Sequence, residues 1–261
     1  MLLRALALTV FLLAAIWVNA FSQSWYQTAH VGRMDTIRAS DIEAVLVPAP
    51  GIFLAATGGG IYRSTDAGSR WSSPWGPKAR ALFSHPDGRI FAGTVAGLAV
   101  STDIGVSWSW VPGHPSRETC RMTRDSQGRL FTGLMDYTYK EGVYRSTDNG
   151  LTWSKVLGSV GVETVETGPG GELYAGGWGL HRSTDAGQTW KMVYSYDSAQ
   201  VRSVIVTQNG VILCGTFVGY GPPYTLKTYR STDNGANWGQ AAAFYAAYFA
   251  TDANNFVYVS C

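Results

Sequence analysis

The sequence predicts an all-β fold, a β-propeller assembled from repeated four-stranded blades. One octapeptide occurs five times in the 261 residues, and its Asp recurs at spacings of 37, 45, 37 and 48 residues. Before each copy stands a Gly-marked hairpin between two β-prone runs, such as Pro86–Gly93. With one strand entering the octapeptide and one leaving it, each repeat has four strands, and a period near 40 residues is typical of propeller blades.

The octapeptide has the pattern S-x-D-x-G-x-x-W and starts at Ser64, Ser101, Ser146, Ser183 and Ser231. It predicts a tight turn, because an Asp carboxylate accepts hydrogen bonds from nearby N–H groups and Gly adopts a positive φ. The Trp then enters the next strand, where its ring can pack beneath the hairpin. We assign a structural role to Asp66, Gly68, Trp71, Asp103, Gly105, Trp108, Asp148, Gly150, Trp153, Asp185, Gly187, Trp190, Asp233, Gly235 and Trp238.

Alignment on the hairpins predicts five full blades and a partial sixth. The full blades span residues 41–75, 78–113, 117–158, 160–197 and 200–241, and the sixth begins at Phe244 with two strands and no octapeptide. Residues 23–26 look like the exit of an octapeptide, so the segment 21–40 is a candidate closing strand. Two alternatives stay open: a six-bladed ring, or a fragment of a seven-bladed one.

On these octapeptides the chain resembles Asp-box (BNR) repeat propellers over residues 41–261. That group includes sialidases, xyloglucan-hydrolysing propellers, sortilin-type receptor domains and the photosystem II assembly-factor group, whose single compact box per blade is the most similar arrangement. The resemblance implies a fold more than a function, because Asp-boxes lie away from the ligand face in catalytic and non-catalytic members alike.

Residues 1–20 are expected to be a secretory signal peptide. Arg4 precedes an apolar stretch from Ala5 to Val18, and Val18-Asn19-Ala20 offers small residues at the two positions that a signal peptidase reads. A stretch of 14 residues is short for a membrane span, although an uncleaved anchor is the alternative. We therefore expect a secreted, periplasmic or cell-surface protein that is not inserted in the membrane after cleavage.

Composition and cysteine usage exclude several classes. With 46% hydrophobic residues, 15% charged residues and a net charge of +2, the chain is neither a disordered protein nor a basic nucleic-acid binder. Cys120, Cys214 and Cys261 have no metal-site spacing, and the first two are expected to be buried apolar side chains. We expect a monomer with no metal and no cofactor.

Insertions mark the predicted ligand face. Blades 3 and 5 carry extra residues between their second and third strands, at 135–141 and 217–227, on the face opposite the octapeptide turns. Tyr and Trp side chains among polar neighbours suit a glycan or a peptide. The candidate ligand-binding residues are Asp136, Tyr137, Tyr139, Trp178, Tyr220 and Tyr224, and the alternative is that these rings cover the insertions themselves.

Charged residues recur at the start of the innermost strands. Eight positions before the hairpin Gly stand Glu43, Arg80, Glu163 and Arg202, which are expected to line one mouth of a central channel. Arginines there can grip a carboxylate, or pair with the two glutamates as a rim network.

These observations favour a non-catalytic propeller that binds a protein, peptide or glycan. A sialidase-like glycoside hydrolase is the first alternative, but the Arg-containing stretch 35–40 lacks the Pro of that family's signature, and Asp136, Glu141, Glu163 and Glu166 form no evident carboxylate pair. An assembly chaperone is the second alternative. We predict no catalytic residues.

Overall fold

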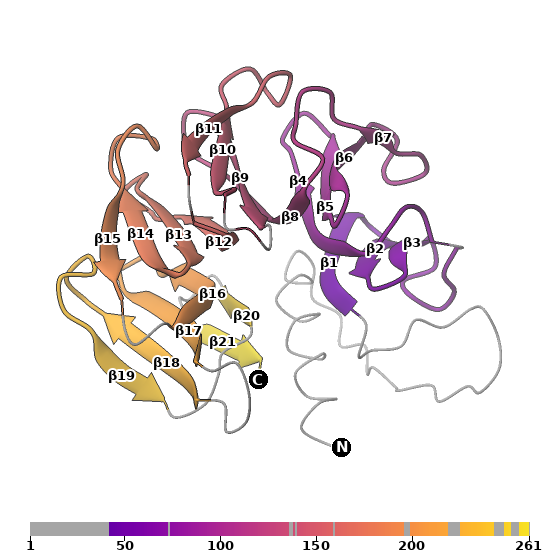
Figure 1. Ribbon diagram of the computed structural model, residues 1–261. Helices are drawn as coiled ribbons and strands as arrows, with labels where there is room; N and C mark the ends of the chain where they lie inside the picture. Colours follow the sequence, from indigo (N-terminus) through magenta and orange to yellow (C-terminus); the bar gives the residue numbers. More distant parts are fainter. Residues whose placement is uncertain are drawn as a thin grey trace. The chain divides into compact units, whose positions relative to one another are not determined.

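The computed structural model describes residues 42–72, 74–135, 138, 140–158, 160–195, 199–218, 225–242, 248–251 and 256–260. The chain divides into two compact units between Val111 and Pro112. All regular structure in the described residues is β-strand, and each sheet joins strands that are consecutive in the chain (Figure 1). This confirms the predicted all-β fold.

Two sheets form the first unit. The blade 1 sheet contains β1 (Ile42–Ala49), β2 (Ile52–Thr57) and β3 (Gly60–Ser64). The blade 2 sheet contains β4 (Ala79–Ser84), β5 (Ile90–Thr94), β6 (Gly97–Ser101) and β7 (Ser109–Trp110). Blade 1 therefore has three named strands rather than the predicted four, and its outer edge is completed by a single bridge between Trp75 and Ile61. Prolines and glycines around Trp75 explain why no longer strand forms there.

The second unit contains three four-stranded blades and a two-stranded sheet. Blade 3 consists of β8 (Glu118–Arg124), β9 (Leu130–Met135), β10 (Val143–Ser146) and β11 (Ser154–Leu157). Blade 4 consists of β12 (Val162–Thr167), β13 (Leu173–Gly177), β14 (Gly179–Ser183) and β15 (Lys191–Tyr194). Blade 5 consists of β16 (Gln200–Val206), β17 (Ile212–Val218), β18 (Thr225–Ser231) and β19 (Gly239–Ala242), and β20 (Tyr248–Thr251) pairs with β21 (Val257–Ser260).

The signal peptide and the closing strand, predicted within residues 1–40, lie outside the described residues. Within the part of the chain that the structure covers, no helix has the length and hydrophobicity needed to cross a membrane.

A β-bulge recurs near the start of the first strand in every blade. The register shifts between Ile42 and Ala44 in β1, and the same irregularity is present in β4, β8, β12 and β16. The extra residues are Glu43, Arg80, Cys120, Glu163 and Arg202. A bulge changes the direction in which a side chain points at the rim of a sheet. These five positions therefore share a backbone geometry as well as a place in the sequence repeat.

The octapeptide turns are built as predicted. In the fourth copy the Asp185 carboxylate accepts hydrogen bonds from the Thr189 amide (2.8 Å), the Thr189 hydroxyl (2.6 Å) and the Ser183 hydroxyl (2.8 Å). Gly187 has φ 82°, and the residue before it, Ala186, also has a positive φ of 60°. That second left-handed residue, present in all five turns, was not predicted.

Hydrogen bonds to the turn carboxylates lower their pKa. The Thr189 side chain, its amide and the Ser183 hydroxyl lower the pKa of Asp185 to about 2. Asp103, Asp148 and Asp233 have pKa values lowered to about 2 by equivalent bonds, and the pKa of Asp66 is lowered too. These carboxylates are permanently charged at neutral pH and fully engaged in the fold, so they are turn-forming groups and not proton-transfer groups.

Within each unit, neighbouring blades pack closely against one another. The second strand of each blade carries a small residue opposite the bulge. In blade 3 this residue is Gly133, and an added Cβ there would stand 2.7 Å from Val162 Cγ1 of the following blade. Buried side chains fill the spaces between blades, with Phe131, Val143 and Val165 in one cluster and Tyr174, Val201 and Cys214 in another. Cys120 and Cys214 are buried, as predicted, and burial raises the pKa of the Cys214 thiol.

Candidate functional site

The candidate site lies at the strand ends opposite the octapeptide turns of blades 4 and 5. Trp178 occupies the short connection between β13 and β14, and it forms an isolated antiparallel bridge with Gln200, the first residue of β16. The connection of one blade thus lies beside the innermost strand of the next. Trp178 is half-buried, so part of its ring remains accessible.

Arg202 links the residues around this bridge. Its Nη2 donates to Gln200 Oε1 at 3.1 Å, its Nε lies 3.4 Å from Glu163 Oε1, and its guanidinium stacks 4.4 Å from the centroid of the Phe217 ring. The Nε itself makes no hydrogen bond. We call Glu163, Trp178, Gln200, Arg202 and Phe217 the mouth cluster. The mouth cluster combines the aromatic rings of Trp178 and Phe217 with the Arg202 guanidinium, which keeps N–H groups able to donate. A neighbouring strand positions each of these groups.

The predicted channel-mouth residues occupy equivalent bulges, and the two glutamates each form an ion pair. Glu163 forms an ion pair with Arg202, and Glu43 forms one with Lys78 at 3.0 Å. Both pairs are partly exposed, so each contributes little net stability. Arg80 and Glu43 lie in the first unit, and Glu163 and Arg202 lie in the second.

A second polar cluster lies at the end of the blade 3 insertion and consists of Glu141, Tyr144, Lys155 and Arg117. Glu141 Oε2 accepts hydrogen bonds from Tyr144 OH (2.7 Å) and lies 3.0 Å from Lys155 Nζ, while Arg117 Nε lies 4.0 Å from Glu141 Oε1. Lys155 also donates to the Lys140 carbonyl. Burial and the bond to Glu141 raise the pKa of Tyr144. The predicted residues Asp136, Tyr137 and Tyr139 lie outside the described residues.

The blade 5 insertion differs from the loop predicted at 217–227. Its two ends extend the sheet, since Phe217 pairs with Leu226 and Val218 pairs with Thr225. The β-branched and aromatic residues there favour strand over loop. Tyr220 and Tyr224 fall in the connection between these strands, outside the described residues.

Glu166 is a titratable group on β12 with a shifted pKa. Burial raises the pKa of Glu166 to about 7, although the nearby Arg121 charge and the Thr167 amide oppose the shift. Thr167, the next residue, shares a hydrogen bond of 2.9 Å with Thr123 of β8. A carboxyl with this pKa carries a proton part of the time at neutral pH and so can donate as well as accept.

We expect folding stability to fall as the pH rises through 7 because of Glu166. Its folded pKa is above the unfolded value of 4.5, so its stabilising contribution is complete below pH 4.5 and is lost as the pH passes about 7. The loss is at most about 3 kcal/mol. Urea unfolding at pH 5, 6, 7 and 8 should show the wild type losing stability relative to Glu166→Gln. A difference that stays constant across these pH values would contradict the expectation.

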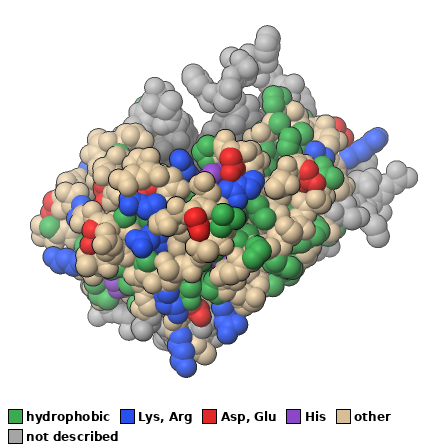
Figure 2. Space-filling model, turned by 90° about the horizontal axis from the view of Figure 1, so that it is seen from above, with side chains coloured by type: hydrophobic (Ala, Val, Ile, Leu, Met, Phe, Trp, Pro, Cys, Tyr) green, Lys and Arg blue, Asp and Glu red, His purple; other side chains and the backbone are tan. Residues whose placement is uncertain are grey.

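Several site residues were missed by sequence reasoning. Gln200 stands two positions before Arg202, and because side chains alternate along a strand this spacing could have placed both on one face. The cluster of Glu141, Tyr144 and Lys155 joins a loop to the two outer strands of blade 3. The sequence does not predict it, because these residues come together only when β10 pairs with β11. On the face presented in Figure 2, basic side chains lie among acidic ones, so recognition depends on individual groups rather than on a broad field of one sign.

The sequence model of the BNR/Asp-box repeat matches residues 144–155, the third octapeptide with its flanks. The match agrees with the turn geometry of this octapeptide and with the four-stranded sheets. The chain contains a BNR/Asp-box repeat, and its fold is that of a β-propeller. No curated protein matches the sequence.

Solved structures similar to this Asp-box propeller include enzymes and sensor domains. An ancestral GH74 enzyme aligns with a TM-score of 0.71 and 19% identity over 82% of this chain and 33% of that one. The GH74 xyloglucanase from Xanthomonas campestris gives 0.62 and 20% over 81% and 42%. The extracellular domain of a putative one-component system from B. thetaiotaomicron gives 0.70 and 13% over 90% and 33%. The chain spans less than half the length of these proteins, and at such identities the likeness establishes the fold alone.

Proposed function

We propose that this Asp-box propeller is a secreted, non-catalytic module that binds a glycan at the mouth cluster. The observation that carries the proposal is the bridge between Trp178 and Gln200, which brings an accessible aromatic ring to the strand that carries Arg202. Aromatic faces beside a few oriented polar groups are typical of small-molecule binding sites. The fold of extracellular sensor domains and of a xyloglucanase is consistent with an extracellular role.

The chemistry of the cluster favours a sugar over an extended peptide. Arg202 stacks on Phe217 and keeps donors for hydroxyl or carboxylate oxygens, while Glu163 and Gln200 supply acceptors for hydroxyl donors. Because the carboxylate and the guanidinium already lie within 3.4 Å of each other, no large reorganisation is needed before a ligand binds.

Replacing Trp178 by alanine should abolish or strongly weaken glycan binding, by about tenfold or more, because a stacked aromatic face is lost. A glycan array on the chain from residue 21 would identify the ligand, and calorimetry would measure its Kd for the wild type and for Trp178→Ala. The matched control is Trp110→Ala, which removes an exposed Trp from β7, in another blade. Equal binding by the wild type and Trp178→Ala would remove the proposal.

A second function, sialidase-like or other glycoside hydrolysis, is favoured by one observation. Glu166 has the raised pKa that a general acid needs, and the neighbours include GH74 enzymes. Hydrolysis also requires a second carboxylate facing the bond, whereas Glu163 is engaged with Arg202. An assay for reducing sugar released from sialosides or xyloglucan oligosaccharides tests this second function. Release by the wild type that is lost in Glu166→Gln would establish hydrolysis in place of glycan binding.

A further inference from the structure

Arg202 is the cation of the mouth cluster, and the groups around it decide which ligand oxygens it can bind. A guanidinium donates equally well to the hydroxyl oxygens of a neutral sugar and to the carboxylate of an acidic one. The Nη2 of Arg202 already donates to Gln200 Oε1 at 3.1 Å, and the Phe217 ring covers one face of the guanidinium. The donors that remain for a ligand are close to Glu163.

Glu163 would repel a carboxylate that bound to this guanidinium. Because Arg202 Nε lies 3.4 Å from Glu163 Oε1, a carboxylate on any other N–H of Arg202 would stand within about 9 Å of that oxygen. This distance is shorter than the Debye length of about 10 Å at 0.1 M salt, so the two negative charges would not be screened from each other.

The backbone holds Glu163 in this position and shields it from water. Glu163 is the bulge residue of β12, and Arg202 is the bulge residue of β16 in the next blade. Only 15% of the Glu163 side chain is exposed, compared with 38% of the Arg202 side chain. Charges interact more strongly where water is excluded. The Glu163 carboxylate therefore compensates the Arg202 charge and opposes a second anion beside it.

The other carboxyl group of β12 also lies near an arginine. Burial raises the pKa of Glu166, and the charge of Arg121, on β8 of blade 3, opposes the rise. Glu163 and Glu166 of β12 thus each interact with an arginine of a neighbouring blade. An acidic sugar would have to compete with β12 for either of these two cations.

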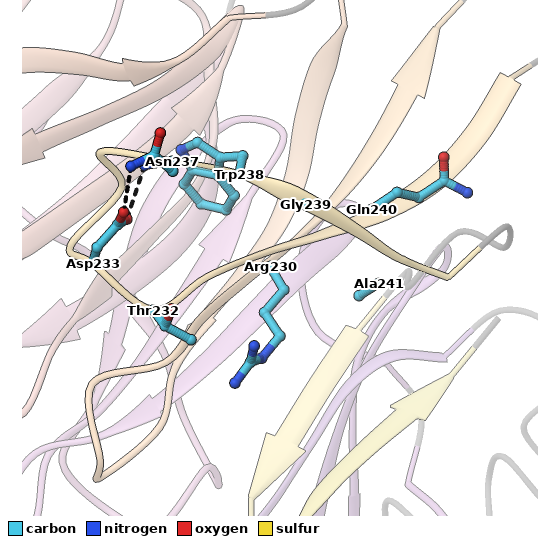
Figure 3. A pocket seen from close by; sticks show the side chains of 8 residues that line it. All are labelled: Arg230, Thr232, Asp233, Asn237, Trp238, Gly239, Gln240 and Ala241. Carbon is cyan, nitrogen blue, oxygen red and sulfur yellow. Dashed lines mark hydrogen bonds between the residues drawn. The ribbon is translucent and has the colours of Figure 1, made fainter.

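An arginine elsewhere on blade 5 serves for comparison. Arg230 is exposed and lines a groove of about 360 Å³ on the outer strands. Figure 3 shows its side chain extending between Thr232 and Ala241, apart from the hydrogen-bonded pair of Asp233 and Asn237. Along β18, Arg230 stands four residues from the partner of Phe217, about 13 Å away. Arg230 is therefore a cation of the same blade outside the mouth cluster.

We propose that the glycan bound at the mouth cluster is uncharged and that Glu163 is the residue that excludes carboxylated sugars. This inference rests on the proposed binding of a glycan at that cluster. The hydroxyl groups of a neutral sugar can accept from Arg202 and donate to Glu163, so both members of the ion pair keep partners. A uronic or sialic acid would bring a like charge to Glu163, and such a repulsive contact discriminates between ligands.

The test is a glycan array that carries neutral oligosaccharides and their acidic counterparts, such as lactose and sialyllactose, probed with the full chain. The wild type should bind a neutral glycan about tenfold or more tightly than its acidic counterpart, as Kd values from calorimetry would show. Glu163→Gln keeps the shape of the side chain and removes its charge. It should bind the acidic counterpart about tenfold more tightly than the wild type does and bind the neutral glycan nearly unchanged.

Matched variants separate the local charge from other effects. Glu172→Gln makes the same substitution in the hairpin between β12 and β13 of the same blade, and it should bind as the wild type does. Adding Arg202→Gln to Glu163→Gln should remove the gained binding of acidic glycans, whereas adding Arg230→Gln should retain it. Glu163→Gln should melt near the wild-type temperature, because a partly exposed ion pair contributes little stability.

The outcomes distinguish this inference from the function on which it rests. Preference of the wild type for acidic glycans would overturn the inference and leave glycan binding at the mouth cluster intact. So would a folded Glu163→Gln that gains no affinity for acidic glycans. Absence of binding to every glycan, or equal binding by the wild type and Trp178→Ala, would instead remove the proposed function. If Glu163→Gln failed to fold, the ranking of neutral and acidic glycans by the wild type would still decide.

Discussion

Gly176→Ala is expected to lower the free energy of unfolding by about 2–3 kcal/mol, because the blades leave no room for a methyl group there. Gly176 lies on β13 opposite Thr164, at the position that follows the bulge residue Glu163 in the paired strand. An added Cβ would stand 2.7 Å from Thr164 Cγ2 and 2.8 Å from both Val201 Cγ1 and the Val201 carbonyl oxygen. The carbonyl belongs to β16, so relief would require the two blades to separate.

Urea unfolding followed by tryptophan fluorescence measures this effect. The matched control is Gly239→Ala on β19, where an added Cβ meets nothing within 4 Å and φ is ordinary, so we expect a change of less than about 0.5 kcal/mol. If both variants unfolded at the same urea concentration, the close approach of β13 to β16 would be contradicted.

Sequence patterns predicted the turns because the bonds that the Asp and Ser side chains make in them are local. Asp, Gly and Trp of an octapeptide lie within eight residues, and the bonds from Thr189 and Ser183 to Asp185 span four and two positions. The positive φ of Ala186 escaped prediction, since three different residue types, Ala, Ile and Asn, occupy that position in the five copies. Ile104 adopts φ 58° there, which a β-branched residue rarely does without help from its surroundings.

Features that involve two strands or two blades were harder to predict. The bulge at Arg202 exists only relative to β17, and an alignment of β16 with the other first strands places the residue without revealing its geometry. Insertion lengths located the blade 5 extension, but the pairing of Phe217 with Leu226 turned its ends into strand. The bridge from Trp178 to Gln200 joins two blades. It brings Trp178, which was predicted as a ligand-binding residue, to the strand of Arg202, which was predicted at the channel mouth. Residues from two separate predictions therefore belong to one site.

Removing the Phe131 ring should have the largest effect on stability: Phe131→Ala is expected to lower the free energy of unfolding by about 3–5 kcal/mol. The ring is 0% exposed, packs with Val143, Val162 and Val165, and carries the fourth Asp-box turn at Gly187. Domains of this kind have only about 5–15 kcal/mol of stability, so a large share would be lost. Leu151→Ala, at a side chain 70% exposed, is the control and should change it by less than about 0.5 kcal/mol.

Hydrogen exchange separates loss of the core from loss of the turn's support. The Gly187 amide bonds Ser183 Oγ at 2.8 Å and the Thr189 amide bonds Asp185, so both should be protected while the turn rests on blade 3. In Phe131→Ala we expect both amides to exchange faster than those of the third turn, at Gly150 and Thr152, relative to the wild type. Uniform acceleration across both turns would show that Phe131 supports the unit as a whole and that the contact between Gly187 and blade 3 has no separate role.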